Sequence, residues 1–283
     1  MKLIECPRDA MQGLADFIPT PSKIAYLNAL LAVGFDTLDF GSFVSPKAIP
    51  QLRDTAEVLA GLDLSTTKTR LLAIVANRRG AETAAQHPEI SYLGFPLSVS
   101  ATFQRRNTNQ TTAEALADVA AMHELCERTG KTLVAYLSMG FGNPYGEAWN
   151  PEIVTDFTRQ LAALGVRIVA LSDTIGASSS ATITPLFSAL IPAFPRIEFG
   201  AHLHTTPDTW HEKVSAAYHA GCRRFDGAIG GIGGCPMAAD ALTGNMATEH
   251  LLDFLAENGQ ESGLDRAAFA RARAAAATVF AFH

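Results

Sequence analysis

The chain has 283 residues, of which 48% are hydrophobic, and its formal net charge is -6. A chain of this length can bury a large core, and its Lys and Arg residues are scattered, which argues against nucleic acid or an anionic membrane as a partner. No stretch has the pattern of a signal peptide or the length of a membrane-spanning segment. We therefore expect a soluble, cytoplasmic protein, and self-association into a homo-oligomer is compatible with the sequence.

The four cysteines (Cys6, Cys126, Cys222 and Cys235) lie far apart and form no CxxC pair. This spacing indicates neither a disulfide framework nor a thiolate zinc site. Cys126 falls on an expected amphipathic helix, and Cys6 and Cys222 lie next to expected strands, where a buried cysteine usually behaves as a small apolar residue. Only Cys235 follows a glycine-rich stretch, residues 230–234, and is expected on a hinged loop.

Short apolar strands alternate with amphipathic helices along the chain without a clear linker. The strands are expected at residues 2–5, 35–40, 71–75, 90–95, 132–137, 166–171, 197–203 and 224–228. The helices are expected at about 20–34, 50–60, 79–86, 111–128, 150–165, 181–190 and 207–220, with two more at 248–257 and 266–280. Eight such units predict the α/β class and a (β/α)₈ TIM barrel, a single domain over residues 1–283 with extra C-terminal helices. An open doubly wound sheet would usually have a glycine fingerprint after its first strand, where this chain has Cys6-Pro7-Arg8-Asp9.

Two histidines at the end of the seventh expected strand indicate a functional site. His202 and His204 are two residues apart, so their side chains project to the same side of the strand. Chemistry in a TIM barrel takes place at the C-terminal ends of the strands. The polar residues expected there include Arg8, Asp9, Gln12, Asp39, Ser42, Tyr136, Ser138, Asp173 and Thr174. Because barrel rims are generally polar and strand histidines often bind carboxylates or backbone, a structural role remains the alternative.

The residue types favour a metal site. His202 and His204, the carboxylate of Asp9 and the amide of Asn245 would form a mixed nitrogen and oxygen set suited to Mg²⁺, Mn²⁺, Co²⁺ or Zn²⁺. Such an ion lowers the pKa of a bound hydroxyl group. Arg8 would offer its guanidinium to a developing enolate or to a carboxylate.

Seven short motifs occur in a fixed order along the chain. They are Arg8-Asp9-Ala10-Met11-Gln12, Ser42-Phe43-Val44-Ser45-Pro46-Lys47, Asn143-Pro144-Tyr145, Ser172-Asp173-Thr174-Ile175-Gly176, His202-Leu203-His204, Gly233-Gly234-Cys235-Pro236 and Gly244-Asn245-Met246-Ala247-Thr248-Glu249. Together they resemble the hydroxymethylglutaryl-CoA lyase family of metal-dependent barrel lyases. The resemblance extends from Glu5 to about Leu252.

The resemblance implies cleavage of 3-hydroxy-3-methylglutaryl-CoA to acetoacetate and acetyl-CoA, a reaction of leucine degradation. It implies that Asp9, His202, His204 and Asn245 bind the metal and that Arg8 stabilises the enolate of acetyl-CoA. In the family's mechanism a base removes the proton of the C3 hydroxyl group and the C2–C3 bond breaks. A loop cysteine then helps to protonate the enolate carbon, and Cys235 matches that cysteine.

The chain departs from the family pattern around the acyl pocket. Thr205 follows the second histidine where the family usually has an acidic residue, and Asp208 is the candidate replacement. Asp39, a candidate catalytic residue, stands where the family tends to have glutamate. The segment 236–244 is one residue longer than usual, and the entry Glu5-Cys6-Pro7 is one residue shorter or shifted. These changes bear on the substrate more than on the fold.

Further residues are candidates for binding an acyl-CoA thioester. Gln12, Ser138, Asp173 and Thr174 are assigned to substrate binding, and Arg105 and Arg106, expected on the loop after the fourth strand, to CoA phosphates. A solvated loop with ordinary surface charges is an equal alternative for the two arginines. For the whole chain, the alternatives are the same chemistry on another 3-hydroxyacyl-CoA, or a non-catalytic paralogue that binds an acyl-CoA or a metal.

Overall fold

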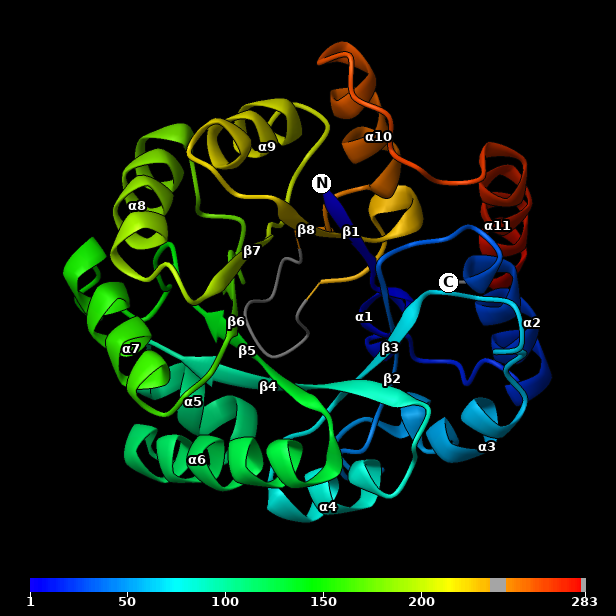
Figure 1. Ribbon diagram of the computed structural model, residues 1–283, viewed down its shortest axis with the longest axis horizontal. Helices are drawn as coiled ribbons and strands as arrows, with labels where there is room; N and C mark the ends of the chain where they lie inside the picture. Colours follow the sequence, from blue (N-terminus) through cyan, green and yellow to red (C-terminus); the bar gives the residue numbers. More distant parts are fainter. Residues whose placement is uncertain (235–242, 281–283) are drawn as a thin grey trace.

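Eight parallel strands close into a barrel in the computed structural model, which describes residues 1–234 and 243–280 (Figure 1). The strands are β1 (Lys2–Glu5), β2 (Thr37–Ser42), β3 (Arg70–Ile74), β4 (Ile90–Ser98), β5 (Thr132–Ser138), β6 (Ile168–Ser172), β7 (Glu198–His202) and β8 (Arg224–Gly227). Each strand pairs with the next one along the chain, and β8 pairs with β1. The predicted TIM barrel is confirmed.

Most of the helices form the outer layer of the barrel, while α1 (Pro7–Gln12) lies inside their ring in the view of Figure 1. The other helices are α2 (Thr20–Leu31), α3 (Thr55–Ala60), α4 (Arg78–Ala85), α5 (Ala101–Thr108), α6 (Thr112–Thr129), α7 (Pro151–Ala163), α8 (Ser180–Ala193), α9 (Trp210–His219), α10 (Thr248–Glu257) and α11 (Arg266–Val279). Two 3₁₀ turns, η1 (Pro50–Leu52) and η2 (Ile229–Gly231), complete the described elements. The extra C-terminal helices are confirmed as α10 and α11, and α11 packs against α2.

Two helices were not predicted from the sequence, and several strand boundaries differ from the expected ones, including that of β2, which was expected at residues 35–40. Helix α1 occupies the expected first loop, with Pro7 at its first position, where proline's fixed φ is favourable. Helix α5 occupies the expected loop after β4, and the Ser100 hydroxyl accepts a hydrogen bond from the Phe103 backbone nitrogen at 3.1 Å to cap it. Strand β4 continues through Pro96 to Ser98 instead of ending at residue 95.

The hydrophobic core has an outer and an inner part. The outer part lies between the strands and helices and includes Leu27, Phe40, Leu93 and Phe187, all almost fully buried. The inner part lies inside the barrel and consists of Leu72, Ile74, Tyr92, Val134, Tyr136, Ile168 and Ala170. Alternation along the strands separates these two sets of side chains.

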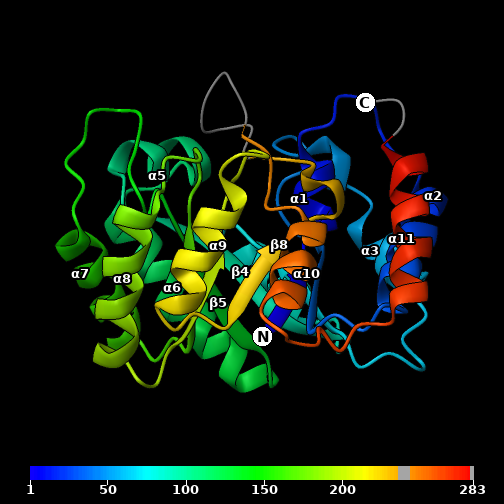
Figure 2. The ribbon, with the colours of Figure 1, turned by 90° about the horizontal axis from the view of Figure 1, so that it is seen from above.

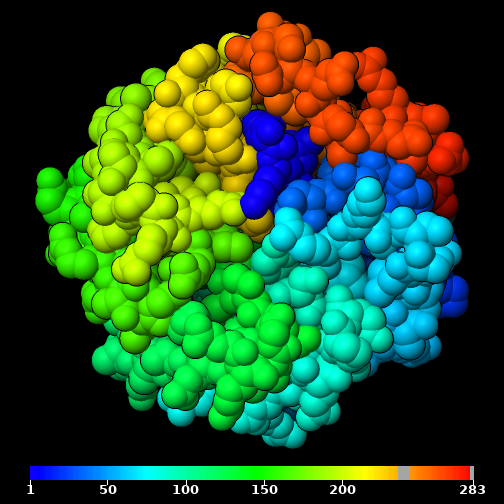
Figure 3. Space-filling model, viewed as in Figure 1, coloured from blue at the N-terminus to red at the C-terminus, as the bar shows by residue number. Residues whose placement is uncertain are grey.

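Ion pairs surround the end of the barrel at which the strands begin. Lys2 pairs with Glu198 at 2.6 Å and Arg70 with Asp36 at 2.6 Å, while the buried Arg224 guanidinium lies 3.5 Å from Glu198. Figure 3 shows the N-terminal residues in the middle of this face. Helix α1 lies at the opposite end of the barrel (Figure 2), which is the end that carries the polar residues discussed next. In residues 1–234 and 243–280, no helix has the length and apolar content needed to cross a membrane.

Candidate active site

Arg8 is held in a fixed position at the start of α1. Its Nε donates to Asp39 Oδ2 at 3.0 Å, and its Nη2 donates to the same oxygen at 2.5 Å. Its Nη1 donates to Asp9 Oδ1 at 2.8 Å and to Gln12 Oε1 at 3.0 Å. The register between β2 and β3 shifts beside Asp39, and such irregularities redirect side chains next to active sites. The guanidinium is therefore oriented on two sides by carboxylates.

Asp9 connects α1 to the segment that precedes α10. Its Oδ1 accepts from Gln12 Nε2 at 2.7 Å, and its Oδ2 accepts from Asn245 Nδ2 at 2.7 Å. Asn245 also donates to the Ile232 carbonyl oxygen at 2.9 Å, and its backbone forms an isolated β-bridge with His204. Residues from both ends of the chain thus meet at one carboxylate.

The two histidines lie side by side at the end of β7, with ring centroids 5.4 Å apart. The Nδ1 of His202 lies 3.1 Å from Asp226 Oδ2, and Asp226 is its direct partner in the register between β7 and β8. The Nδ1 of His204 lies 2.9 Å from the carbonyl oxygen of Thr243. Contacts of this kind fix the orientation of imidazoles that serve as ligands.

The side chains of Asp9, His202 and His204 form a group that fits a metal ion. One potential ligand atom from each residue lies within 4.8 Å of the others. One carboxylate oxygen and two imidazole nitrogens suit the divalent first-row metals, which accept this mixture of donors. Asn245 adjoins the group, although its Nδ2 and not its oxygen faces Asp9.

Buried charges set the protonation of this group. Burial alone would raise the pKa of Asp9, but the charges of Arg8 and the two histidines lower it below its usual range. Burial and the neighbouring His202 lower the pKa of His204 to about 4, which keeps this ring in the neutral form that binds metals. For His202, burial lowers the pKa, but the hydrogen bond and charge of Asp226 outweigh burial and raise it. Burial raises the pKa of Asp39 to about 6 against the effect of Arg8, so Asp39 is ionised at neutral pH.

The glycine-rich stretch reaches this site at Gly233. Its φ is +107°, and a Cβ at this position would lie 2.6 Å from Asn245 Nδ2 and 2.9 Å from both the Asp9 carbonyl oxygen and the Ala10 Cα. Such distances leave no space for a side chain. Cys235, predicted to be a catalytic loop thiol, lies outside the described residues.

Asp173, assigned from the sequence to substrate binding, makes several contacts within the protein. Its Oδ1 accepts from the Ser178 backbone nitrogen at 3.0 Å, and its Oδ2 accepts from the Ser178 hydroxyl at 2.5 Å and from Lys213 Nζ at 2.8 Å. The Thr174 hydroxyl accepts from the Met139 backbone nitrogen at 2.8 Å, and Ser138 is buried at the end of β5. The arrangement places Asp173 and Thr174 at the expected end of the barrel.

Arg105 and Arg106 lie on the last turn of α5 and are exposed. The loop location expected from the sequence is wrong, because Ser100 caps a helix there. The Arg106 guanidinium lies 5.4 Å from the centroid of the Tyr145 ring, within the range of a cation–π contact. Among the described contacts, neither arginine joins the group around Asp9.

The sequence reasoning missed two buried charged residues beside the site. Asp226 was overlooked, although an acidic residue inside an apolar strand indicates a specific partner. Lys213 lies on the buried face of α9 with Val214 and Ala217, and it donates to Asp173 and to two carbonyl oxygens. In the sequence, a lysine on the otherwise apolar face of an expected helix is the signal that could have indicated a buried partner for Lys213. Asp208, the suggested replacement for an acidic residue at Thr205, is exposed.

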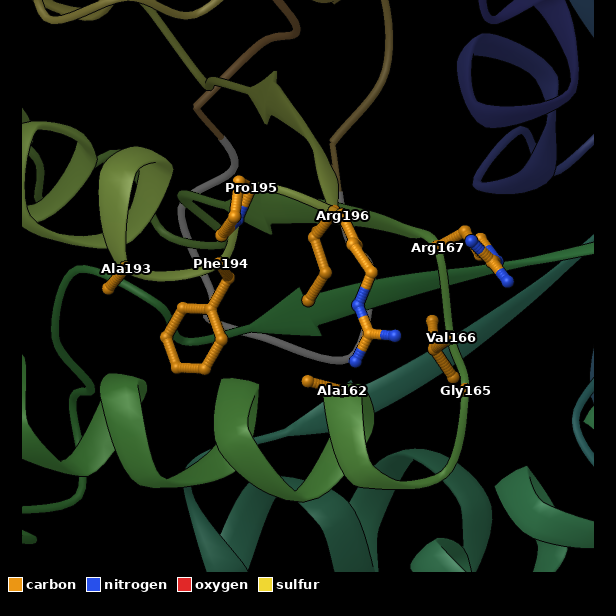
Figure 4. A pocket seen from close by; sticks show the side chains of 9 residues that line it. Ala162, Gly165, Val166, Arg167, Ala193, Phe194, Pro195 and Arg196 are labelled. Atoms are coloured by element: carbon orange, nitrogen blue, oxygen red, sulfur yellow. The ribbon is translucent and has the colours of Figure 1, made fainter.

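A surface pocket lies at the other end of the barrel. Its lining comes from the last turns of α7 and α8 and from the segments that lead from them to β6 and β7, and it includes Ala162, Arg167, Phe194 and Arg196. Figure 4 shows the side chains of Phe194 and Arg196 on the side of α7 where Ala162 lies. Because strands β6 and β7 start here, this pocket is remote from the residues at their C-terminal ends.

Comparisons with known proteins identify the family of this chain. The HMGL-like family model matches residues 3–275. Hydroxymethylglutaryl-CoA lyase of Bacillus subtilis (strain 168) is 35% identical over 88% of this chain and 82% of its own length. The (R)-citramalyl-CoA lyase of Chloroflexus aurantiacus is 31% identical over 93% of this chain and 85% of its own length.

A solved structure is similar over almost the whole chain. The HMG-CoA lyase of Acinetobacter baumannii, in complex with coenzyme A and 3-methylmalate, superposes with a TM-score of 0.91 at 30% identity. The match covers 99% of this chain and 90% of that one. The family model and these relatives together show that the chain belongs to the HMGL-like family and is an enzyme of the lyase type.

Proposed function

We propose that this protein is a divalent-metal-dependent carbon–carbon lyase that cleaves 3-hydroxy-3-methylglutaryl-CoA to acetoacetate and acetyl-CoA. The observation that carries the proposal is the group of Asp9, His202 and His204, whose potential ligand atoms lie within 4.8 Å of one another beside Arg8. The Bacillus relative, named for this reaction, supports the choice of substrate.

The proposed metal ligands are Asp9, His202 and His204, with Asn245 as a fourth once its amide oxygen faces the group. A divalent ion bound there would supply Lewis acidity for the oxygen atoms of the substrate, and Mg²⁺, Mn²⁺, Co²⁺ and Zn²⁺ are the candidates for a set of mixed nitrogen and oxygen donors. Asp226 orients His202 through the contact at 3.1 Å, and the Thr243 carbonyl oxygen does the same for His204. These contacts reduce the rearrangement that binding requires.

Arg8 retains one N–H group for the substrate. A guanidinium has five N–H donors. In the described contacts, Nε uses its one donor on Asp39, Nη1 uses two on Asp9 and Gln12, and Nη2 uses one on Asp39. The remaining Nη2 hydrogen is therefore available to the thioester oxygen, on which negative charge develops when the C2–C3 bond breaks. Asp39 and Gln12 act by orienting this donor.

The reaction also requires two proton movements. A base accepts the proton of the C3 hydroxyl group while the electron pair of the C2–C3 bond moves to the thioester, which leaves a keto group in acetoacetate and an enolate of acetyl-CoA. The enolate carbon then takes up a proton. We assign this donation to Cys235 from the motif Gly233-Gly234-Cys235-Pro236, and the pantetheine chain and phosphates of CoA to the side of the barrel near Arg105 and Arg106.

A second candidate substrate is a 3-hydroxyacyl-CoA with a different acyl group. Asp39 is a short carboxylate fully engaged by Arg8, and the Chloroflexus relative is named for (R)-citramalyl-CoA. The acyl pocket of this chain can therefore differ from that of a hydroxymethylglutaryl-CoA lyase. Acyl chain length and the group at C3 are the features to compare.

The test is to incubate the purified protein with Mg²⁺ or Mn²⁺ and hydroxymethylglutaryl-CoA and to measure acetoacetate and acetyl-CoA. An EDTA-treated sample and Asp9→Asn are the controls, and both are expected to release neither product. Parallel assays with citramalyl-CoA separate the two candidates. Metal-dependent release from citramalyl-CoA alone would replace the proposed substrate. Product release unaffected by EDTA and by Asp9→Asn would refute the metal site.

A further inference from the structure

Cys6 lies inside the barrel beside two residues of the proposed active site. Its backbone nitrogen donates to the Gly227 carbonyl oxygen at 2.8 Å, so the β1–β8 pairing continues to this residue. Ile4 is in register with Asp226, and Asp226 with His202. Cys6 comes two residues after Ile4, and side chains two residues apart share one face of a strand. The thiol, expected from the sequence only to fill space, therefore points toward Asp226 and His202.

Cys6, His202 and Asp226 form a second group with the geometry of a cation site. One potential ligand atom from each lies within 4.8 Å of the others, and Cys6 and Asp226 are 1% and 3% exposed. The donors are sulfur, nitrogen and oxygen, whereas the group around Asp9 has only nitrogen and oxygen. Thiolate ligands select softer ions such as Zn²⁺ over Mg²⁺ and Mn²⁺.

An unpartnered oxygen supports this assignment independently. Asp226 Oδ2 contacts His202, but Asp226 Oδ1 has no hydrogen-bond partner among the described residues and is shielded from solvent. Buried carboxylate oxygens are normally satisfied, because an unsatisfied one loses its hydration without compensation. Among the residues that the structure describes, the thiol of Cys6 makes one hydrogen bond, a long one of 3.9 Å to the Ile4 carbonyl oxygen. Both atoms are thus free to bind a common ion.

We propose that Cys6, His202 and Asp226 bind a thiophilic divalent cation, Zn²⁺ or Cd²⁺, at a position that competes with the metal group of Asp9, His202 and His204. The two groups share His202. An ion bound by Cys6, His202 and Asp226 also displaces Asp226 from its contact with the imidazole. Occupancy by a soft ion therefore inhibits the enzyme. The inhibition rests on the proposed function, whereas the binding site does not.

The charges of the surroundings favour one ion at a time. The carboxylates of Asp9, Asp39 and Asp226 and the guanidinium of Arg8 leave two negative charges, and Cys6 adds a third when its thiol releases a proton and binds as a thiolate. One divalent cation offsets most of this charge, and a second would introduce repulsion over a short distance. The softness of the ion then decides which of the two groups it occupies.

Cd²⁺ provides the test, because a cadmium–thiolate bond gives an ultraviolet charge-transfer absorption whether or not the protein turns over a substrate. Titration is done in a Cys235→Ser background, which removes the thiol predicted to lie near the site. A saturable thiolate absorption is expected. Cys6→Ser in this background should abolish the absorption and weaken Cd²⁺ binding about tenfold or more, as expected for the loss of a ligand.

Cys222→Ser is the matched control, because Cys222 is also a buried thiol and its hydrogen bonds to described residues go to carbonyl oxygens. It should retain the absorption. Cys6→Ala is a second variant for the case that serine at this buried position prevents folding, which circular dichroism detects. Absorption that persists in Cys6→Ser or Cys6→Ala, or that never appears in the Cys235→Ser parent, overturns the proposal. A protein that shows the absorption but cleaves no acyl-CoA would refute the proposed function and leave the cation site in place.

Discussion

The ammonium group of Lys213 lies 2.8 Å from Asp173 Oδ2, and the two side chains are only 3% and 1% exposed. Lys213 also donates to the Gly176 carbonyl oxygen at 2.9 Å and to the His204 carbonyl oxygen at 2.8 Å. One buried cation thus connects the loop after β6 to the backbone of a proposed metal ligand. The pair is expected to stabilise both the fold and the position of His204.

Replacing Lys213 by methionine should therefore destabilise the folded protein. Removing one partner of a buried ion pair leaves the other charge uncompensated, and the loss of unfolding free energy is about 3–5 kcal/mol. Urea denaturation measures this loss. The exposed Lys68 provides the control, since Lys68→Met should change stability by less than about 0.5 kcal/mol. Equal stability of the two variants would show that the ion pair contributes little.

The metal group predicts a loss of Mn²⁺ affinity in His202→Ala and Asp9→Asn. Each change removes one ligand from a group of three, so binding measured by calorimetry or electron paramagnetic resonance should weaken by more than about tenfold. His219→Ala is the matched histidine control, because His219 is exposed on α9. Metal content equal to that of the parent in both variants would contradict the assignment.

Asp39 should act on catalysis through Arg8. Asp39→Asn removes the charge that orients the guanidinium at 3.0 Å, so kcat is expected to fall about 10- to 100-fold while KM changes less. Asp39→Glu keeps the charge and should recover part of kcat. A change confined to KM would instead assign Asp39 to substrate binding.

Cys235→Ala should reduce turnover more than metal binding. The motif Gly233-Gly234-Cys235-Pro236 is the basis for assigning this thiol to protonation of the enolate. The measurement compares kcat with Mn²⁺ affinity in the same preparation. An unchanged kcat would remove Cys235 from the chemistry.

Glu5 predicts a specific pH dependence of stability. This buried carboxyl group accepts from Thr248 Oγ1 at 2.5 Å and from the Ile229 backbone nitrogen at 2.8 Å, and burial raises its pKa from 4.5 to about 8. The folded state therefore binds a proton that the unfolded state releases above pH 4.5. The stabilisation of the folded state by protonated Glu5 is fully present below pH 4.5 and is lost as the pH rises to about 8.

Glu5→Gln should remove this dependence, because glutamine carries no titratable proton. Relative to the variant, the parent should lose up to about 1.4 kcal/mol per pH unit between pH 4.5 and 8. Guanidinium denaturation at several pH values measures the difference. Parallel pH profiles for the two proteins would show that the carboxyl group is already ionised in the folded state.

Much of the fold and part of the site could be predicted from the sequence. Strand and helix periodicity is local, so the eight units were recognised and the TIM barrel is confirmed. The pairing of His202 with His204 follows from the period of a strand, and the structure brings both beside Asp9. The family resemblance is also confirmed.

Other features depend on contacts between distant residues. Asp226 becomes a partner of His202 only through the register of β7 with β8, and Lys213 reaches Asp173 only because α9 packs beside the loop after β6. The direction of Cys6 depends on the continuation of the β1–β8 pairing. Helix α5 was missed because the capping role of Ser100 was not recognised. The roles assigned to Gln12, Ser138 and Thr174 in substrate binding remain predictions.

The close approach at Gly233 limits how this enzyme can change during evolution. Any side chain there would separate Asn245 from the Asp9 backbone, so alanine already disturbs the site, while the positive φ penalises every L-residue. In a library that randomises this codon and selects for activity, glycine alone should survive. New substrate preferences must therefore arise at other positions around the barrel mouth, while the close approach of Gly233 to Asn245 and Asp9 is kept.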